Sequence, residues 1–247
     1  MSPQGQARDR LWWAPASLRP FVRTVGHRAL SGVGSIASVR TKHPLLALTF
    51  DDGPCPEHTP GIVDVLRRHR VRATFFQLAS QAGEYPELAR SVVAEGHEVA
   101  LHGNDHSRLD RRALGHVRES VRLGRQRLEG IIERPVRWFR PPFGSQSPRS
   151  YAAVRSLGLE VVVWSGLGYD WLDLPAGDVV RHVDAACHPG AIILLHDAQR
   201  SLPIPTFDRA AVVDELLGSL KRRGLTPVTV QELVRAGKKE KRAWFKH

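Results

Sequence analysis

The chain has 247 residues, which suits one large α/β domain or two small ones and is long enough to bury a core without disulfides. Its only two cysteines, Cys55 and Cys187, exclude a disulfide framework and a paired-cysteine zinc motif. The net charge of +11 belongs to the ends, because residues 1–43 carry +6, residues 235–247 carry +5 and residues 44–234 carry none. The neutral central part argues against a nucleic-acid-binding domain.

The N-terminal segment, residues 1–43, is predicted to be a basic extension that contains an amphipathic helix. Its apolar residues fall at helical spacing: Leu18, Phe21, Val22, Val25 and Ala29. We expect this helix to cover one end of the domain, with solvated basic tails at both ends of the chain. Peripheral contact of the tails with an anionic membrane or polymer is the alternative, because basic residues here alternate with tryptophans.

The sequence shows no secretory signal and no apolar run of membrane-spanning length. We therefore expect a cytoplasmic protein or one attached peripherally to a membrane.

From residue 45 onward, strand-like apolar runs alternate with helix-like segments. The predicted strands are 45–50, 73–78, 97–101, 136–139, 160–164, 191–195 and 227–230. Helices are predicted between them at 59–69, 86–96, 111–132, from 147, 178–187 and 208–223. Ser147 is predicted to cap the helix that begins there, and Thr229 with Glu232 caps a last one. Seven such units predict one parallel-strand domain over 44–234. No Gly-x-Gly-x-x-Gly follows a strand, so a closed, irregular (β/α) barrel fits better than an open sheet.

Polar side chains follow five of the predicted strands directly or in the next loop. In chain order they are Asp51 and Asp52, His102, Arg140, Asp170 with Trp171, and His196 with Asp197. In a parallel barrel these strand ends open on one face, where barrel enzymes build their active sites. The sequence therefore predicts an active site at this face.

A metal site is predicted from His102 and His106, which are four residues apart just past a strand. Two imidazoles and one carboxylate leave open coordination positions, as in catalytic rather than structural sites. Asp51 and Asp52 are adjacent like charges, so their pKa values should separate into a ligand and a base. Spacing alone does not say which is which.

Four further groups have a predicted chemical role. Arg140 has the planar fork that holds a carboxylate in place, and the loop 141–144 offers backbone N–H groups, such as that of Phe143, to a developing oxyanion. His196 is the strand-end histidine that remains once two are assigned to the metal, so it is the predicted general acid. Asp170 is predicted to orient His196.

Five segments in this order resemble the motifs of the polysaccharide deacetylases, the NodB-homology proteins of carbohydrate esterase family four. They are Thr-Phe-Asp-Asp-Gly-Pro at 49–54, His-x-x-x-His at 102–106, Arg-Pro-Pro-Phe-Gly at 140–144, Asp-Trp at 170–171 and Leu-x-His at 194–196. The resemblance covers residues 45–234. It implies a distorted, incomplete (β/α) barrel, related to the TIM barrel, and a metal-dependent hydrolase that removes N-acetyl or O-acetyl groups from a sugar or polysaccharide.

The resemblance also implies a role for each matching residue. Asp51 would be the general base, positioned by Arg140, and Asp52 would bind the metal with His102 and His106. The Phe143 N–H would contact the oxyanion, Trp171 and Leu194 would line the acetyl pocket, and His196 with Asp170 would protonate the leaving amine. The expected ion is Zn²⁺, with Co²⁺, Mn²⁺ or Ni²⁺ as alternatives.

Five positions depart from the family pattern: Gly103 replaces Ser or Thr, Ala100-Leu101 replace Gly-Asn, Phe143 replaces a common Tyr, and Leu167 replaces an acidic residue. Two other functions therefore stay open. One is a deacetylase or deformylase of a small or lipid-linked aminosugar. The other is a catalytically silent carbohydrate- or envelope-binding module. The sequence leaves the oligomeric state open.

Overall fold

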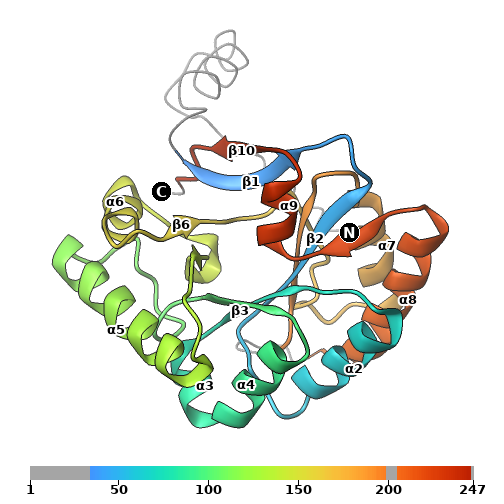
Figure 1. Ribbon diagram of the computed structural model, residues 1–247, viewed down its shortest axis with the longest axis horizontal. Coiled ribbons are helices and arrows are strands. Elements are labelled where there is room, and N and C mark those ends of the chain that lie inside the picture. Colours follow the sequence, from blue (N-terminus) through green and yellow to red (C-terminus); the bar gives the residue numbers. More distant parts are fainter. Residues whose placement is uncertain (1–33, 199–204, 246–247) are drawn as a thin grey trace, which may run out of the picture.

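The computed structural model describes residues 34–198 and 205–245, in which a parallel sheet curls into a half-barrel with helices outside it (Figure 1). The strands of this sheet are β2 Leu45–Asp51, β3 Thr74–Gln77, β4 Glu98–Leu101, β5 Trp138–Phe139, β6 Glu160–Val161, β7 Gly166–Leu167, β8 Ile192–His196 and β9 Thr226–Val228. The helices are α2 Thr59–His69, α3 Ala79–Glu84, α4 Pro86–Ala94, α5 Leu114–Ile132, the 3₁₀ turn η1 Pro142–Gly144, α6 Pro148–Ser156, α7 Ala176–Ala186, α8 Arg209–Arg222 and α9 Val230–Arg235. The predicted caps at Ser147 and Thr229 are confirmed as capping boxes of α6 and α9.

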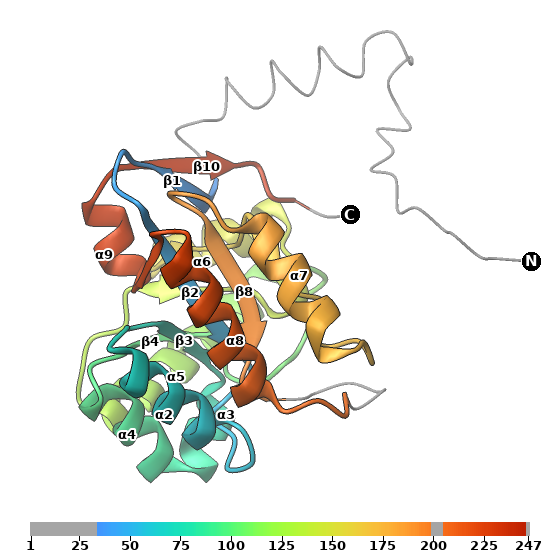
Figure 2. The same ribbon diagram turned by 90° about the vertical axis from the view of Figure 1, so that its right-hand side faces the viewer.

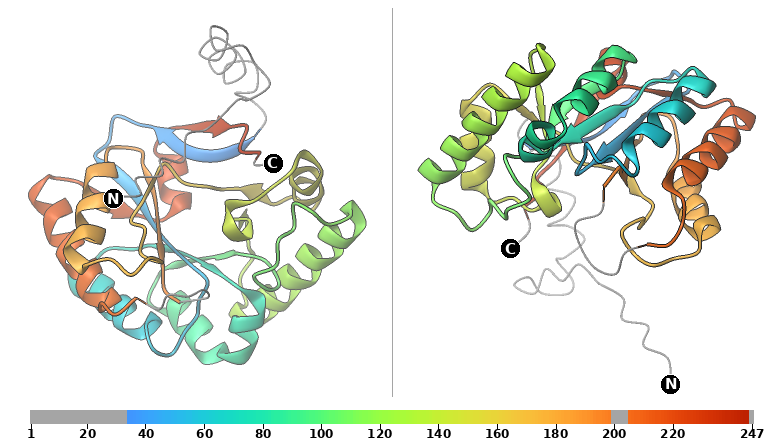
Figure 3. Two further views of the ribbon diagram at one scale, coloured as in Figure 1. Left: turned by 180° about the vertical axis from the view of Figure 1, so that it is seen from behind. Right: turned by 90° about the horizontal axis from the view of Figure 1, so that it is seen from below.

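Strand β2 lies at the centre of the sheet. The strand order is β6-β5-β4-β3-β2-β8-β7, and all of these pairs are parallel. The first half of β2 also pairs with β9, whereas its second half pairs with β3. The ring of helices around the strands is visible from behind in Figure 3. The predicted α/β fold, a distorted and incomplete barrel of parallel strands, is confirmed.

Successive side chains of β2 point alternately into two different layers of the core. Leu46, Leu48 and Phe50 pack with the helices, whereas Ala47 belongs to the cluster inside the half-barrel. Because side chains alternate along a strand, Thr49 and Asp51 share the inner face with Ala47. The buried strand therefore directs one carboxylate into the half-barrel at its carboxyl end.

The predicted strand 160–164 forms two short strands, β6 and β7, and the sheet is not continuous between them. Strand β1, Ser35–Arg40, spans this opening through bridges from Ile36 to Val162 and from Ser38 to Ala191. It also pairs in antiparallel fashion with β10, Lys238–Arg242 (Figure 2). The opening between β6 and β7 is thus closed by two strands, one near each terminus of the described chain.

The predicted extensions lie partly inside these described ranges. The sequence predicts a basic tail over 235–247, whereas residues 238–242 form β10, because β1 offers them a free strand edge. The predicted amphipathic helix falls on residues that lie outside the described ranges, and the domain limits at 44 and 234 stay a prediction. Within the described ranges, the helices are all too short or too polar to cross a bilayer.

Candidate active site

The carboxyl ends of the parallel strands bring several predicted residues to one end of the half-barrel. Asp51 ends β2 and lies in register with His196, which ends β8. His102 directly follows β4, and its Nδ1 lies 3.8 Å from Oδ2 of Asp51. Arg140 directly follows β5. Side chains that are far apart in sequence therefore meet at one site.

Asp52, His102 and His106 form a cluster in which one ligand atom from each lies within 4.8 Å of the others. Nε2 of His102 and Nε2 of His106 are both 3.3 Å from Oδ1 of Asp52. Asp52 has a φ of 81°, so the chain leaves the line of β2 at this residue. A carboxylate with two imidazoles suits a divalent ion whose remaining coordination positions are open.

The electrostatics of this cluster also fit a metal ion. Burial alone would raise the pKa of Asp52, but its hydrogen bond to His102 and the nearby imidazoles outweigh burial and hold that pKa well below its usual range. Burial lowers the pKa of His106, which favours the neutral imidazole. Ionised carboxylate and neutral imidazole are the protonation states that metal ligands need. Nδ1 of His102 is buried and makes no hydrogen bond within the described ranges.

Asp51 is held by the fully buried Arg140. Nη1 of Arg140 donates to Oδ1 of Asp51 at 2.7 Å and to Oγ1 of Thr49 at 2.8 Å, while Nη2 donates to the carbonyl of Val163 at 3.1 Å. The guanidinium also lies 3.9 Å from the ring centre of Phe76. Burial lowers the pKa of Arg140, whereas the nearby Asp51 carboxylate acts to raise it. The contacts on several sides fix the position of the guanidinium.

His196 and Asp170 form a second pair. Nδ1 of His196 is 2.8 Å from Oδ1 of Asp170, and the His196 backbone N–H donates to Oδ2 at 2.7 Å. Burial would lower the pKa of His196, but the Asp170 carboxylate outweighs it and raises this pKa to about 9. Arg209 completes the group, because its Nη1 donates to Oδ2 of Asp170 at 2.9 Å. No motif in the sequence pointed to Arg209, which comes from the start of α8.

Asp197 is a second residue for which the sequence predicts no role. Its carboxylate is buried and accepts hydrogen bonds from the Gly53 N–H at 3.1 Å and the Thr59 hydroxyl at 2.7 Å. Burial raises the pKa of Asp197 to about 7. A Cβ at Gly53 would lie 2.1 Å from Oδ2 of Asp197, so the close approach requires glycine. Asp197 thus anchors the turn that follows Asp52.

The remaining predicted residues surround these polar groups. Phe143 has a φ of 60°, and its ring centre lies 4.2 Å from that of His106. The ring of Trp171 meets that of His196 edge-on at 5.5 Å. Leu194 is buried in a small apolar cluster against which Trp171 packs. All of the predicted side chains therefore contact the polar groups or their immediate neighbours.

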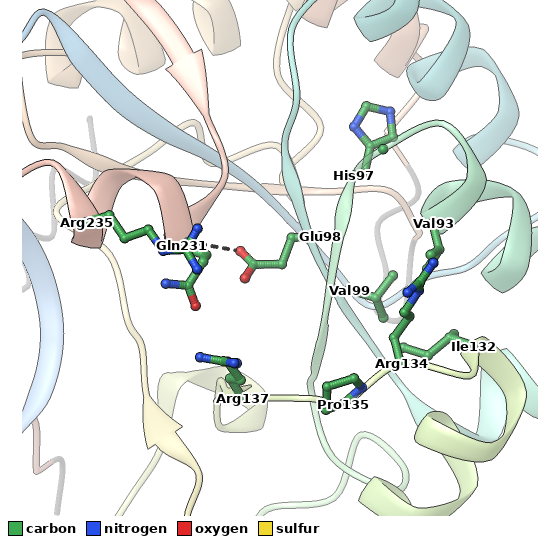
Figure 4. Close-up of a pocket in the computed structure, with 11 residues that line it drawn as sticks. Val93, His97, Glu98, Val99, Ile132, Arg134, Pro135, Arg137, Gln231 and Arg235 are labelled. Carbon is green, nitrogen blue, oxygen red and sulfur yellow. Dashed lines mark hydrogen bonds between the residues drawn. The ribbon is translucent and has the colours of Figure 1, made fainter.

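A separate pocket of about 400 Å³ lies at the opposite ends of the strands (Figure 4). Glu98, the first residue of β4, lines it together with Arg137, Gln231 and Arg235. Glu98 accepts a hydrogen bond from the Gln231 backbone N–H at 3.1 Å. None of the predicted site residues lines this pocket, so it is distinct from the candidate active site.

Comparisons with known proteins agree with this geometry. The chain is 36% identical over 169 residues to a chitooligosaccharide deacetylase of Azorhizobium caulinodans, which covers 68% of this chain and 80% of that protein. It is 35% identical over 188 residues to the peptidoglycan-N-acetylglucosamine deacetylase PgdA of Listeria monocytogenes; this match covers 76% of this chain but only 38% of PgdA.

The fold has solved counterparts as well. A structure of the Bc1960 peptidoglycan N-acetylglucosamine deacetylase matches with a TM-score of 0.79 at 25% identity, over 87% of this chain and 100% of that one. The family profile described as polysaccharide deacetylase matches residues 38–162. The motifs, the fold and these matches together confirm the resemblance, and the chain belongs to the polysaccharide deacetylase family.

Proposed function

We propose that this chain is a metal-dependent hydrolase that removes N-acetyl groups from a glucosamine-containing oligomer of the chitooligosaccharide or peptidoglycan type. The names of its relatives support this substrate class. One observation carries the proposal: the cluster of Asp52, His102 and His106 lies beside Asp51, while His196 lies in register with Asp51 on the neighbouring strand.

Asp52, His102 and His106 hold the divalent ion in this proposal. This donor set, with an ionised Asp52 and a neutral His106, suits Zn²⁺, with Co²⁺, Mn²⁺ or Ni²⁺ as alternatives. When bound, such an ion polarises the acetyl carbonyl and lowers the pKa of water at the site.

Asp51 acts as the general base and takes a proton from the attacking water. Its hydrogen bond from Arg140 fixes the position of the carboxylate. The same contact leaves Oδ2 of Asp51 on the side of His102, toward the metal ligands. The proposed base and the proposed metal ligands therefore face the same part of the site, where the acetyl group would react.

His196 acts as the general acid and donates a proton to the leaving amine. The pKa of about 9 that Asp170 maintains keeps the imidazole protonated at neutral pH. The Phe143 N–H stabilises the oxyanion, and Trp171 with Leu194 lines the space for the acetyl methyl group, as the family resemblance implies.

Acetate release from chitooligosaccharides and from peptidoglycan fragments tests this proposal, after chelation and after reloading with Zn²⁺, Co²⁺, Mn²⁺ or Ni²⁺. Asp51→Asn should keep the metal, measured by mass spectrometry, and lose about 10²–10⁴ in kcat, as expected for removal of a general base. The double variant Asp52→Ala/His102→Ala should lose both the metal and turnover.

The matched control is His116→Ala, which removes an exposed histidine of α5 and should keep both properties. Acetate release by the metal-site double variant at the wild-type rate would contradict the proposal. The two alternatives have their own outcomes: turnover of only small or lipid-linked aminosugars supports the first, and saturable sugar binding without acetate release under any metal supports the silent module.

A further inference from the structure

Backbone strain concentrates around the candidate active site. Five non-glycine residues within the described ranges have positive φ: Asp52, Arg70, Glu133, Phe143 and Tyr169. Arg70 and Glu133 end helices α2 and α5, where a left-handed residue is ordinary. The other three belong to the site, and only Tyr169 among them has no role so far. A bulky aromatic in this conformation is unusual, and such strain gathers at ligand-binding positions.

Exposed apolar side chains point to the same loop. The large hydrophobic residues that are exposed within the described ranges are Leu114, Leu123, Phe143, Tyr169 and Leu172. Leu114 and Leu123 lie on the outer helix α5, whereas the other three lie beside the site residues. The Tyr169 side chain is 43% exposed. Its backbone φ of 56° is a conformation that glycine would adopt at a lower energetic cost than tyrosine. Strain and exposure are independent observations, and both single out Tyr169.

The contacts of Tyr169 connect it to the predicted general acid. Its ring centre lies 5.5 Å from that of Trp171, which in turn lies 5.5 Å from the imidazole of His196. On another side, His182 of α7 meets Tyr169 at 5.4 Å in an edge-on arrangement. An aromatic series therefore runs from His196 through Trp171 to an exposed ring.

We propose that Tyr169 forms a binding subsite for the sugar ring next to the one that is deacetylated. The inference rests on the proposed function and names a residue that recognises the oligomer rather than a single sugar. A pyranose ring has an apolar C–H face, which packs on the electron-rich face of an aromatic ring, while its hydroxyl groups stay at the edge in water. Trp171 borders the reacting sugar, so Tyr169 meets its neighbour.

Deacetylation of N-acetylglucosamine and of penta-N-acetylchitopentaose by the metal-loaded enzyme tests the subsite. N-acetylglucosamine has no neighbouring ring, so only the pentamer reaches Tyr169, and Tyr169→Ala should lower the ratio of the pentamer's kcat/KM to that of N-acetylglucosamine by about three- to tenfold, the range for one aromatic contact. Tyr169→Phe keeps the ring and should retain the wild-type ratio. The matched control, Leu123→Ala, removes a 46% exposed side chain from α5 and should leave the ratio unchanged.

A binding measurement separates this inference from the proposed function. Isothermal titration of penta-N-acetylchitopentaose into metal-loaded Asp51→Asn should show a weaker affinity, by about the same factor, when Tyr169→Ala is added. If affinity for the oligomer depends on Tyr169 but the wild-type protein releases no acetate, the subsite is supported and the proposed deacetylase activity is overturned. If the wild-type protein releases acetate but Tyr169→Ala changes neither the kcat/KM ratio of the two substrates nor the affinity for the pentamer, only the subsite is overturned. Equal losses on both substrates with a lower melting temperature would also overturn it, because they indicate loop packing.

Discussion

At the scale of residues, two buried arginines define the chemistry of the site. Arg140 holds Asp51, and Arg209 holds Asp170, so each of the two key carboxylates has a fixed orientation. Burying such ion pairs adds little to stability, since desolvation offsets their attraction. Their value lies in position, because they direct one carboxylate toward His102 and the other toward His196.

The Asp170 carboxylate should set the alkaline limit of activity. Because it raises the pKa of His196 to about 9, kcat should stay high through neutral pH and fall as pH rises through 9, where the general acid loses its proton. Asp170→Asn removes this charge, so the alkaline limb should move down toward the ordinary histidine value of 6.5. The measurement is kcat against pH with a saturating sugar oligomer.

Asp173→Asn provides the control, because Asp173 is an exposed acid in the same loop. An alkaline limb that is identical in wild type and Asp170→Asn would rule out His196 as the general acid held by Asp170.

At the scale of elements, the strand pair β1–β10 supports the loop that follows Arg140. Trp244, just beyond β10, donates from Nε1 to the carbonyl of Gly144 at 3.0 Å, and its ring packs on Trp164 at 5.2 Å. A Cβ at Gly144 would lie 2.4 Å from the ring of Trp164, so the loop is tightly packed. The C-terminal segment therefore contacts the loop that carries Phe143.

Removing the Trp244 ring should loosen this loop. For a half-buried indole, Trp244→Ala should lower the free energy of unfolding by about 1–3 kcal/mol, less than for a fully buried one. It should also lower kcat, because the Phe143 N–H loses its support. Urea unfolding and acetate release measure the two effects. Lys238→Ala in β10 removes an exposed side chain and should change neither; equal behaviour of the two variants would exclude the supporting role.

At the scale of the whole molecule, metal binding and folding should be coupled. Asp52 follows β2, and both histidines follow β4, so the ion would join neighbouring parts of the half-barrel. An ion at a hundred times its Kd stabilises the folded state by about 2.7 kcal/mol, so chelation should lower the melting temperature by about 5–10 °C. Calorimetry of chelated and Zn²⁺-reloaded protein measures this shift. Asp52→Ala/His102→Ala should show no shift; a melting temperature that ignores chelation in wild type would contradict the coupling.

Local patterns were sufficient for the parts of the fold that local physics determines. The apolar run that became β2 and the capping pairs at Ser147 and Thr229 depend on neighbouring residues, so the sequence predicts them. The break between β6 and β7 depends on β1 spanning the barrel opening, which no local pattern records. The strand Lys-Lys-Glu-Lys-Arg of β10 likewise owes its form to its partner rather than to its own propensity.

The site divides in the same way. Asp51, His102, Arg140 and His196 follow strands, so the parallel sheet alone predicts that they converge. Arg209 lies at the start of a helix, where a charged residue is normally solvated, and only the packing of α8 buries it against Asp170. The sequence does not single out Tyr169 for another reason: its backbone conformation, not its residue type, distinguishes it.

The pairing of β1 with β10 has a consequence for how the chain is made. Ser38 and Glu240 share a hydrogen bond although they are 202 positions apart. While the ribosome synthesises the chain from its N-terminus, the edge of β1 that pairs with β10 has no partner until residues 238–242 emerge. The opening beside β6 therefore stays without its complete closing pair until β10 is made, and until then the nascent chain holds an unpaired strand edge that is open to non-native pairing.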